Sequence, residues 1–104
     1  MTSIAITVCT RHRPRMLRQC LASVLAELQE RDSDDFVVVV ENDAATNSAH
    51  VVEELRTSFP QSRLFYELET EPGIPFARNR TVDIARREGA DWVAFIDDDE
   101  QLVP

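Results

Sequence analysis

Four consecutive carboxylates follow an apolar run near the end of the sequence, in the stretch DWVAFIDDDEQ. At an effective dielectric of about 20, two like charges about 4 Å apart repel each other by roughly 4 kcal/mol. A divalent cation would offset this repulsion, because Mg²⁺ and Mn²⁺ take oxygen ligands from carboxylates and substrate phosphates. Side chains alternate along an extended chain, so Asp97 and Asp99 should point to one side and Asp98 to the other. The run therefore predicts a metal site with Asp97 and Asp99 as ligands; the alternative is a solvated acidic turn.

A basic segment, FARNR, lies at the start of a predicted helix. Free backbone N–H groups and the helix macrodipole favour an anion at such a position. Arg78 is therefore predicted to contact a phosphate group. Arg80 is explained at least as well by an ion pair with a nearby acid such as Glu71 or Asp83.

Two further arginines, Arg11 and Arg13, follow the first apolar run in CTRHRP and give a second cationic edge. His12 between them is predicted to be a surface or hydrogen-bonded residue, because no second histidine or cysteine has the spacing of a metal site. In ENDAATN, after the next apolar run, Glu41 and Asp43 are candidates to accept hydrogen bonds from a ligand. For Asp43 the alternative is a cap on the following helix.

Strands and helices alternate along the chain and must position these residues. The apolar runs SIAITVC and FVVVVE lack polar alternation, which is typical of strands covered on both faces of a parallel sheet. Between such runs, apolar residues recur at three- and four-residue steps, Pro14 and Pro75 suit the first turn of a helix, and Gly89 suits a helix end. Strands are predicted over 3–9, 36–41, 63–69 and 91–96, and helices over 14–28, 48–59 and 74–88.

The resulting order, β-α-β-α-β-α-β, predicts a three-layer α/β/α fold around a mostly parallel sheet of about four strands. In open sheets of this kind, ligands bind beyond the carboxyl ends of the strands. The polar segments CTRHRP, ENDAATN, ETEPGIP and DDDEQ all follow predicted strands. We therefore expect them to meet at one edge of the sheet and to form one site.

Composition bounds the class of protein. The chain has 104 residues, 43% of them apolar, which fits one small domain over residues 1–104. Its formal charge of -8 disfavours binding to nucleic acid or anionic membranes. No long apolar segment or signal peptide is visible, so we expect no membrane insertion and a cytoplasmic location. Cys9 and Cys20 are expected to be reduced, buried thiols.

Taken together, these motifs resemble the family 2 inverting glycosyltransferases, whose N-terminal half has the Rossmann-like GT-A fold. The P-T-Y-N-R-like turn of the family is matched by residues 9–13, and its D-D-G-S or D-N-D strand end by residues 41–43. Its G-x-x-x-A-R-N helix start is matched by Gly73, Ala77, Arg78 and Asn79. Its D-x-D strand end is matched by residues 97–99, with Pro104 as the proline that follows. The resemblance covers nearly the whole chain.

The resemblance implies a nucleotide-diphosphate sugar as donor and a divalent metal, Mn²⁺ or Mg²⁺, as cofactor. It implies that Asp97 and Asp99 hold the metal on the diphosphate and that Asp98 lies near the ribose or the sugar. Arg78 would approach the diphosphate. Arg11 stands where the family often has an aromatic residue, and Glu41 replaces a shorter aspartate, so the resemblance leaves the base open. The residues implied to bind the rest of the donor are Thr10, Arg11, Arg13, Glu41, Asn42 and Asp43.

The resemblance also implies that the catalytic base and the acceptor site lie beyond residue 104. We therefore expect a truncated, single partial domain that binds the donor and transfers no sugar by itself. Two alternatives stay open. One is a sugar-nucleotidyltransferase, although CTRHRP lacks the glycine-rich loop usual in that class; the other is a non-catalytic nucleotide-binding or assembly module.

The fourth predicted strand, 91–96, has a further consequence. By resemblance it lies beside the first strand, and strands after residue 104 would pair with its other edge. In this chain, its unpaired backbone groups and apolar side chains favour association between copies. We therefore expect a homodimer through this edge.

Overall fold

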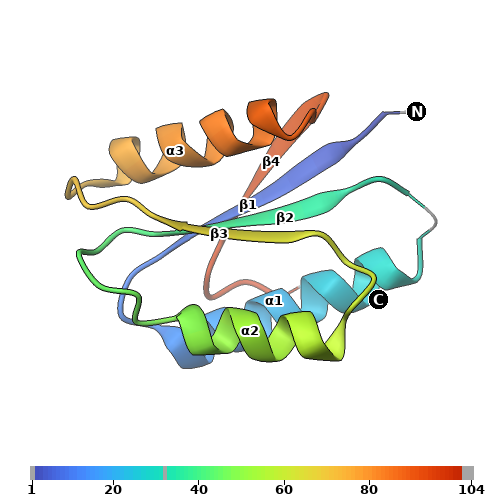
Figure 1. The fold of residues 1–104 in the computed structure, drawn as a ribbon, viewed down its shortest axis with the longest axis horizontal. Helices are drawn as coiled ribbons and strands as arrows, with labels where there is room; N and C mark the ends of the chain where they lie inside the picture. Colours follow the sequence, from blue (N-terminus) through green and yellow to red (C-terminus); the bar gives the residue numbers. More distant parts are fainter. Residues whose placement is uncertain (1, 32, 102–104) are drawn as a thin grey trace.

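The computed structural model describes residues 2–31 and 33–101, which form an alternating α/β fold (Figure 1). The predicted order of strands and helices is confirmed, with ends that differ by at most one residue. The strands are β1 (Ile4–Thr10), β2 (Phe36–Glu41), β3 (Leu64–Leu68) and β4 (Trp92–Asp97). The helices are α1 (Pro14–Gln29), α2 (Ala49–Ser58) and α3 (Ile74–Arg87).

All strand pairs in the sheet are parallel, in the order β3-β2-β1-β4. The fourth strand therefore lies beside the first, as expected, and Cys9 is in register with Asp97. Parallel pairing places the carboxyl ends of all four strands at the same edge of the sheet. The polar segments that follow the strands are thereby brought together.

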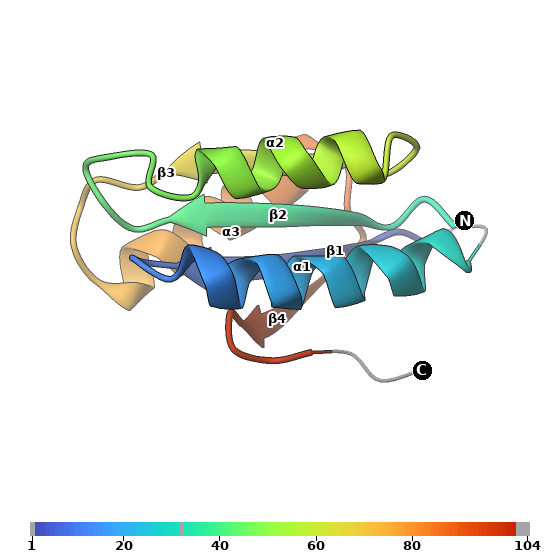
Figure 2. The ribbon, with the colours of Figure 1, turned by 90° about the horizontal axis from the view of Figure 1, so that it is seen from below.

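Two helical layers cover the sheet, so the three-layer prediction is confirmed. Alternate side chains of the fully buried strand β2 face opposite layers. Val37 and Val39 pack in one core with α1 and α2, whereas Val38 and Val40 pack in a second core with α3. Figure 2 shows α1 and α2 side by side on the first face, with α3 behind the sheet.

Proline and glycine set the helix ends where the sequence predicts. Pro14 and Pro75 lie in the first turns of α1 and α3. Gly89 has φ 87°, and its N–H donates to the carbonyl of Arg86 at 3.1 Å while the N–H of Ala90 donates to that of Ala85 at 3.0 Å. This pair of bonds closes α3, because glycine adopts the left-handed conformation without strain.

The outer edge of β4 has no strand partner within the described part of the chain. Trp92 and Phe95 on this strand are 66% and 48% exposed. Val93, by contrast, is partly buried and packs against the core under α3. None of the helices in residues 2–31 and 33–101 is long and apolar enough to cross a membrane.

Self-association through β4 stays a prediction, and substitution at Trp92 tests it. We expect light scattering over a dilution series to show a dimer that Trp92→Lys dissociates, because a lysine at an edge opposes pairing between strands. Met16, an apolar side chain of α1 that is 46% exposed, offers the control Met16→Lys. A chain that stays monomeric at high concentration, or a dimer equally weakened by both substitutions, would contradict the prediction.

Candidate functional site

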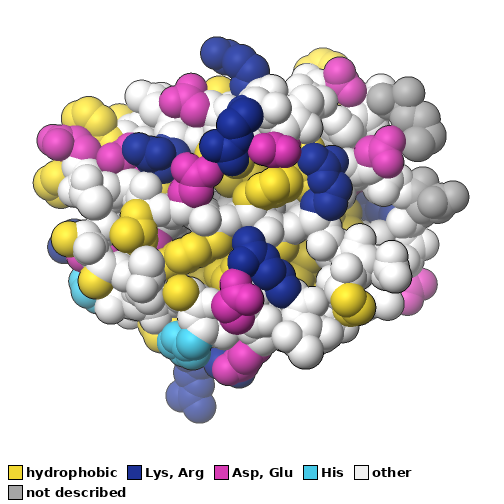
Figure 3. All heavy atoms as spheres, in the orientation of Figure 1, with side chains coloured by type: hydrophobic (Ala, Val, Ile, Leu, Met, Phe, Trp, Pro, Cys, Tyr) yellow, Lys and Arg dark blue, Asp and Glu magenta, His cyan; other side chains and the backbone are white. Residues whose placement is uncertain are grey.

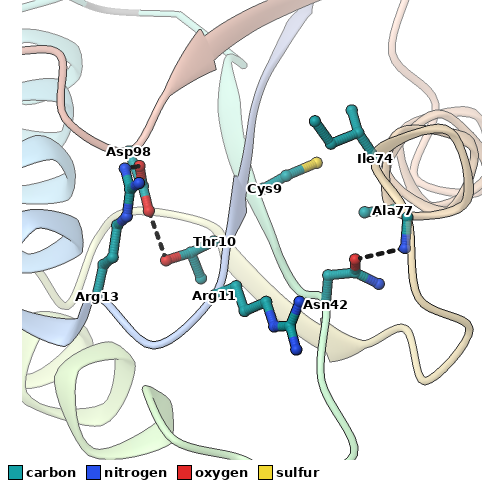
Figure 4. A pocket seen from close by; sticks show the side chains of 9 residues that line it. Cys9, Thr10, Arg11, Arg13, Asn42, Ile74, Ala77 and Asp98 are labelled. Atoms are coloured by element: carbon teal, nitrogen blue, oxygen red, sulfur yellow. Dashed lines mark hydrogen bonds and ion pairs between the residues drawn. The ribbon is translucent and has the colours of Figure 1, made fainter.

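A cleft of about 370 Å³ opens at the carboxyl edge of the sheet (Figure 4). Its volume lies within the range of small-molecule sites. The close-up shows Arg13 beside Asp98, Arg11 extending toward Asn42, and Ile74 and Ala77 facing them from α3. Five predicted site residues thus meet in the cleft. The complete lining is Cys9, Thr10, Arg11, Arg13, Asn42, Gly73, Ile74, Ala77 and Asp98.

Asp98 is the buried member of the acid run. Only 7% of its surface is exposed. One carboxylate oxygen accepts a hydrogen bond from the Thr10 hydroxyl at 2.9 Å, and the other lies 3.3 Å from an Arg13 guanidinium nitrogen. The carboxylate therefore joins the end of β4 to the loop that follows β1.

Asp97 and Asp99 lie at the surface on either side of Asp98. The chain turns after Asp97 instead of continuing extended: the Glu100 N–H donates to the Asp97 carbonyl at 3.0 Å, and the Asp97 N–H donates to the Glu100 carboxylate at 2.7 Å. Among the described residues, neither the Asp97 nor the Asp99 carboxylate has a hydrogen-bond or ion-pair partner. Both are available to a ligand.

Asn42 holds the loop that leads into α3. Its amide nitrogen donates to the carbonyls of Glu69 and Glu71 at 3.0 and 2.8 Å, and its amide oxygen accepts from the Gly73 N–H at 3.0 Å. Gly73 has φ 128°, a backbone conformation that residues other than glycine rarely adopt. Gly73, Ile74 and Ala77 line the cleft, so the N-terminus of α3, with the positive end of the helix dipole, borders it. No side chain of the described residues caps this end of the helix.

Glu41 does not line the cleft and is fully buried. Its carboxylate accepts the Ser48 N–H at 2.9 Å, the Ser48 hydroxyl at 3.3 Å, and the hydroxyl of Tyr66. Burial, together with the bond to Glu41, raises the pKa of Tyr66 and keeps its hydroxyl protonated. These contacts tie together the end of β2, the start of α2 and the middle of β3.

Asp43 lies between two loops. One carboxylate oxygen is 2.8 Å from His12 Nε2 and accepts the Asn47 amide at 2.7 Å, while the other accepts the N–H of Ala44 at 2.7 Å. Asp43 does not cap α2, whose N-cap is Ser48. His12 is therefore hydrogen-bonded at the surface, as the sequence predicts.

Arg78 lies outside the lining of the main cleft, in a hollow of about 130 Å³ beside it. Its guanidinium carbon is 5.4 Å from the centre of the Phe95 ring. Asp97 lines the same hollow, so this arginine and a predicted metal ligand share the end of β4. The remaining lining residues are Thr7, Cys9, Ile74 and Ile96, of which Cys9 and Ile74 also line the main cleft.

Arg80 pairs with local acids, as one of the two interpretations of the sequence expects. Its partners are Glu67 at 3.3 Å and Glu69 at 3.1 Å, in place of Glu71 and Asp83. Arg87 also pairs with Glu67, so Glu67 joins the two arginines. Figure 3 shows basic and acidic side chains interspersed on the face of the molecule that Figure 1 presents.

Both cysteines are free thiols. Burial, reinforced by the surrounding carboxylates of the acid run, raises the pKa of Cys20 to about 12. Burial also raises the pKa of Cys9, against the lowering effect of Arg78. Neither thiol is therefore ionised near neutral pH, which disfavours a nucleophilic role.

The sequence did not single out Cys9 and Ile74 as lining residues. Cys9 is the penultimate residue of β1 and Ile74 the first of α3, so their positions follow from strand ends and helix starts. Within the described residues, no group of three or more histidine, cysteine or acidic side chains is arranged to hold a metal. A cation bound by Asp97 and Asp99 would need further oxygen ligands from a bound molecule or water.

Comparison with known proteins identifies the family to which this chain belongs. The model of the family described as "Glycosyl transferase family 2" matches residues 3–104. The "Succinoglycan biosynthesis protein ExoM" of Rhizobium meliloti (strain 1021) is 35% identical over 99 residues, which are 95% of this chain and 30% of that protein. The chain thus spans about 30% of the length of this curated relative.

Two solved structures share the fold. The "Crystal structure of S. aureus TarS" superposes with a TM-score of 0.71 at 22% identity, over 95% of this chain and 17% of that one. The "Crystal structure of S. aureus TarS 1-349" gives a TM-score of 0.64 at 20% identity, over 97% and 28%. The likeness confirms the fold class: a Rossmann-like sheet of the GT-A type.

The contacts of Glu41 yield a prediction about stability. Glu41→Gln replaces one acceptor oxygen with a donor that faces Ser48 or Tyr66, and a buried polar group left unpaired costs about 1–3 kcal/mol. We expect urea unfolding to show a loss of this size. Tyr66→Phe, which removes one donor and leaves the carboxylate two others, is the milder matched change. If Glu41→Gln is as stable as the original chain, the carboxylate does not hold these elements together.

Proposed function

Because this chain belongs to glycosyl transferase family 2, we propose that its cleft binds a nucleotide-diphosphate sugar with a divalent cation, Mn²⁺ or Mg²⁺. In the longer protein of which such a domain is part, the sugar would be transferred to an acceptor with inversion at the anomeric carbon. The observation that carries the proposal is a pair of exposed carboxylates, Asp97 and Asp99, that have no partner among the described residues. They flank Asp98 in a cleft that is also lined by Arg11, Arg13 and the start of α3.

The chemistry of the carboxyl edge fits a hard divalent cation. Asp97 and Asp99 offer oxygen ligands without competing partners in the described structure. Mg²⁺ is usually held by one or two carboxylates completed by substrate phosphates, and Mn²⁺ accepts the same ligands. Asp98 is already bonded to Thr10 and Arg13, so we assign it to holding the site together beside the ribose or sugar.

The cleft has the charges needed for a diphosphate. The chain carries a formal charge of -8, so an anion requires local cations. Arg11 and Arg13 line the cleft, and the uncapped N-terminus of α3 adds the positive end of a helix dipole. Arg78 shares a hollow with Asp97, which supports a contact with the diphosphate close to the proposed metal.

The nucleoside would occupy the part of the cleft between Arg11 and Asn42. A guanidinium group can stack on a base in place of an aromatic ring. Glu41 and Asn42 are occupied by contacts to Ser48, Tyr66 and the loop before α3. We therefore propose that they shape this part of the cleft and that Thr10 and Arg11 are nearest the nucleoside.

The residues of this chain would bind and orient the donor. When bound, a divalent cation neutralises charge that develops on the departing nucleoside diphosphate. The acidic side chains around the cleft already have roles in this proposal: Asp97 and Asp99 bind the metal, Asp98 is paired with Arg13, and the buried Glu41 accepts three hydrogen bonds. We propose that the base and the acceptor site come from elsewhere in a longer protein and that this chain alone transfers no sugar. Acceptor-dependent release of nucleoside diphosphate by the chain would contradict this.

The proposal predicts that metal and nucleoside diphosphate bind cooperatively. Calorimetry with UDP, GDP, ADP and CDP should find one that binds with Mn²⁺ present and about tenfold or more weakly with a chelator, since charged contacts contribute about 1.5–3 kcal/mol. Asp99→Asn should remove the metal dependence. Asp34→Asn, an exposed acid far along the chain from the site, is the control. Equal binding in chelator, or unchanged metal dependence in Asp99→Asn, would exclude this metal assignment.

A second prediction concerns Arg78. Its loss should weaken binding of the diphosphate by about 1.5–3 kcal/mol and leave binding of the nucleoside nearly intact, because the contact that the ligand loses is the one to phosphate. Titration of Arg78→Ala with both ligands measures the difference. Arg86→Ala removes the same charge from the other end of α3 and serves as control. An equal loss for both ligands would show that Arg78 supports the fold instead.

A further inference from the structure

His12 has an unusual backbone conformation in the loop that follows β1. With φ 54°, it is the one non-glycine residue with positive φ among those described. This left-handed conformation is unfavourable for a residue with a Cβ and persists where surrounding contacts hold it. His12 lies between Arg11 and Arg13, both of which line the cleft. The strained residue is thus placed between the two cationic side chains of the proposed diphosphate site.

The His12 side chain explains how the conformation is held. Its Nε2 lies 2.8 Å from Asp43 Oδ2, and its Nδ1 lies 3.3 Å from the Asn47 amide nitrogen. The same amide nitrogen donates to Asp43 Oδ2 at 2.7 Å. These three side chains, which we call the His12 latch, join the loop after β1 to the loop after β2.

The geometry of the latch selects one form of the imidazole. Asp43 can only accept at Nε2, and the Asn47 amide donates toward Nδ1. A neutral ring with its proton on Nε2 satisfies both contacts. A ring protonated on both nitrogens would place a donor at Nδ1 against the amide of Asn47. The latch is therefore a hydrogen-bonded link that does not require the imidazolium.

The latch leaves Arg11 directed at the cleft. Figure 4 shows the Arg11 side chain extending toward Asn42, while Arg13 lies against Asp98. Arg11 has no hydrogen-bond or ion-pair partner within residues 2–31 and 33–101, so no side-chain contact of its own keeps it there. Its placement depends on the backbone of the loop, and the next residue along that backbone is His12.

We propose that His12 is a positioning residue: the His12 latch fixes the loop after β1 so that Arg11 and Arg13 face a diphosphate before it binds. This inference rests on the proposed function of the cleft. Arginines fixed in advance do not have to be ordered on binding, a cost that otherwise weakens affinity. Asp43 acts through His12 in this account, and contact with the base is not its role.

The test compares His12→Gly with the original chain. Glycine adopts positive φ freely, so the variant should fold with a similar melting temperature while the latch is lost. We expect its affinity for the tightest-binding of UDP, GDP, ADP and CDP to fall about tenfold in the presence of Mn²⁺, the cost of ordering the loop after β1 and the Arg11 side chain on binding. Affinity for the matching nucleoside, which Arg11 contacts without any phosphate charge to attract, should fall by clearly less. His50→Ala, which removes an exposed histidine from α2, should bind as the original chain does.

A spectroscopic measurement separates the latch from any effect on stability. In the ligand-free chain, the ¹⁵N–¹H correlation spectrum of His12 should show a proton on Nε2 that is shifted downfield and exchanges slowly with water, because it is hydrogen-bonded to Asp43. Asp43→Ala should remove both the downfield shift and the slow exchange. A His12 Nε2 proton that exchanges as fast in the original chain as in Asp43→Ala would overturn the latch.

The binding measurements distinguish failure of the role of His12 from failure of the proposed function. If the original chain binds a nucleoside diphosphate and His12→Gly binds it equally well, the positioning role is wrong and the proposed function stands. If the original chain binds none of the four nucleoside diphosphates, with or without Mn²⁺, the proposed function fails and the positioning role fails with it. A loss shared equally by nucleoside and diphosphate would also overturn the role of His12.

Discussion

The buried carboxylate of Asp98 is the constraint on which the rest of the site depends. A charge removed from water is tolerated only when hydrogen bonds and an opposite charge replace its hydration. Thr10 and Arg13 supply both, and in doing so they join the end of β4 to the loop after β1. The chain then turns at once, which leaves Asp97 and Asp99 at the surface and free of partners in the described structure. One paired acid thus positions two unpaired ones.

At the neighbouring strand ends too, some polar side chains hold loops in place while others remain exposed to a ligand. Glu41 is hydrogen-bonded to Ser48 and Tyr66, and Asn42 is hydrogen-bonded to the loop before α3. These hydrogen bonds fix the loops, and they leave the two side chains without free polar groups for a ligand. The charged side chains that stay available to a ligand are Arg11, a cation on the cleft side, and Asp97 and Asp99, two anions at the end of β4. A phosphate bridged to a divalent cation is complementary to that arrangement.

The fold could be predicted from the sequence because it rests on periodicity. Apolar runs such as FVVVVE, helical spacing after Pro14, and Gly89 at a helix end are local signals that the parallel sheet satisfies together. The gathering of site residues at one edge followed from topology alone. The partners of individual side chains did not. Burial of Glu41 under Tyr66 and the left-handed backbone of His12 depend on how loops far apart in sequence meet, and no spacing rule encodes that.

The division between a supporting Asp98 and metal-binding Asp97 and Asp99 is the central claim, and the position of a bound cation tests it most directly. Crystals of the chain grown with Mn²⁺ and its preferred nucleoside diphosphate would locate the metal by anomalous scattering at the manganese edge. We predict a peak within about 2.5 Å of a carboxylate oxygen of Asp97 or Asp99 and of a phosphate oxygen, with Asp98 still bonded to Thr10. A peak coordinated by Asp98, or a diphosphate bound with manganese at neither Asp97 nor Asp99, would contradict the account.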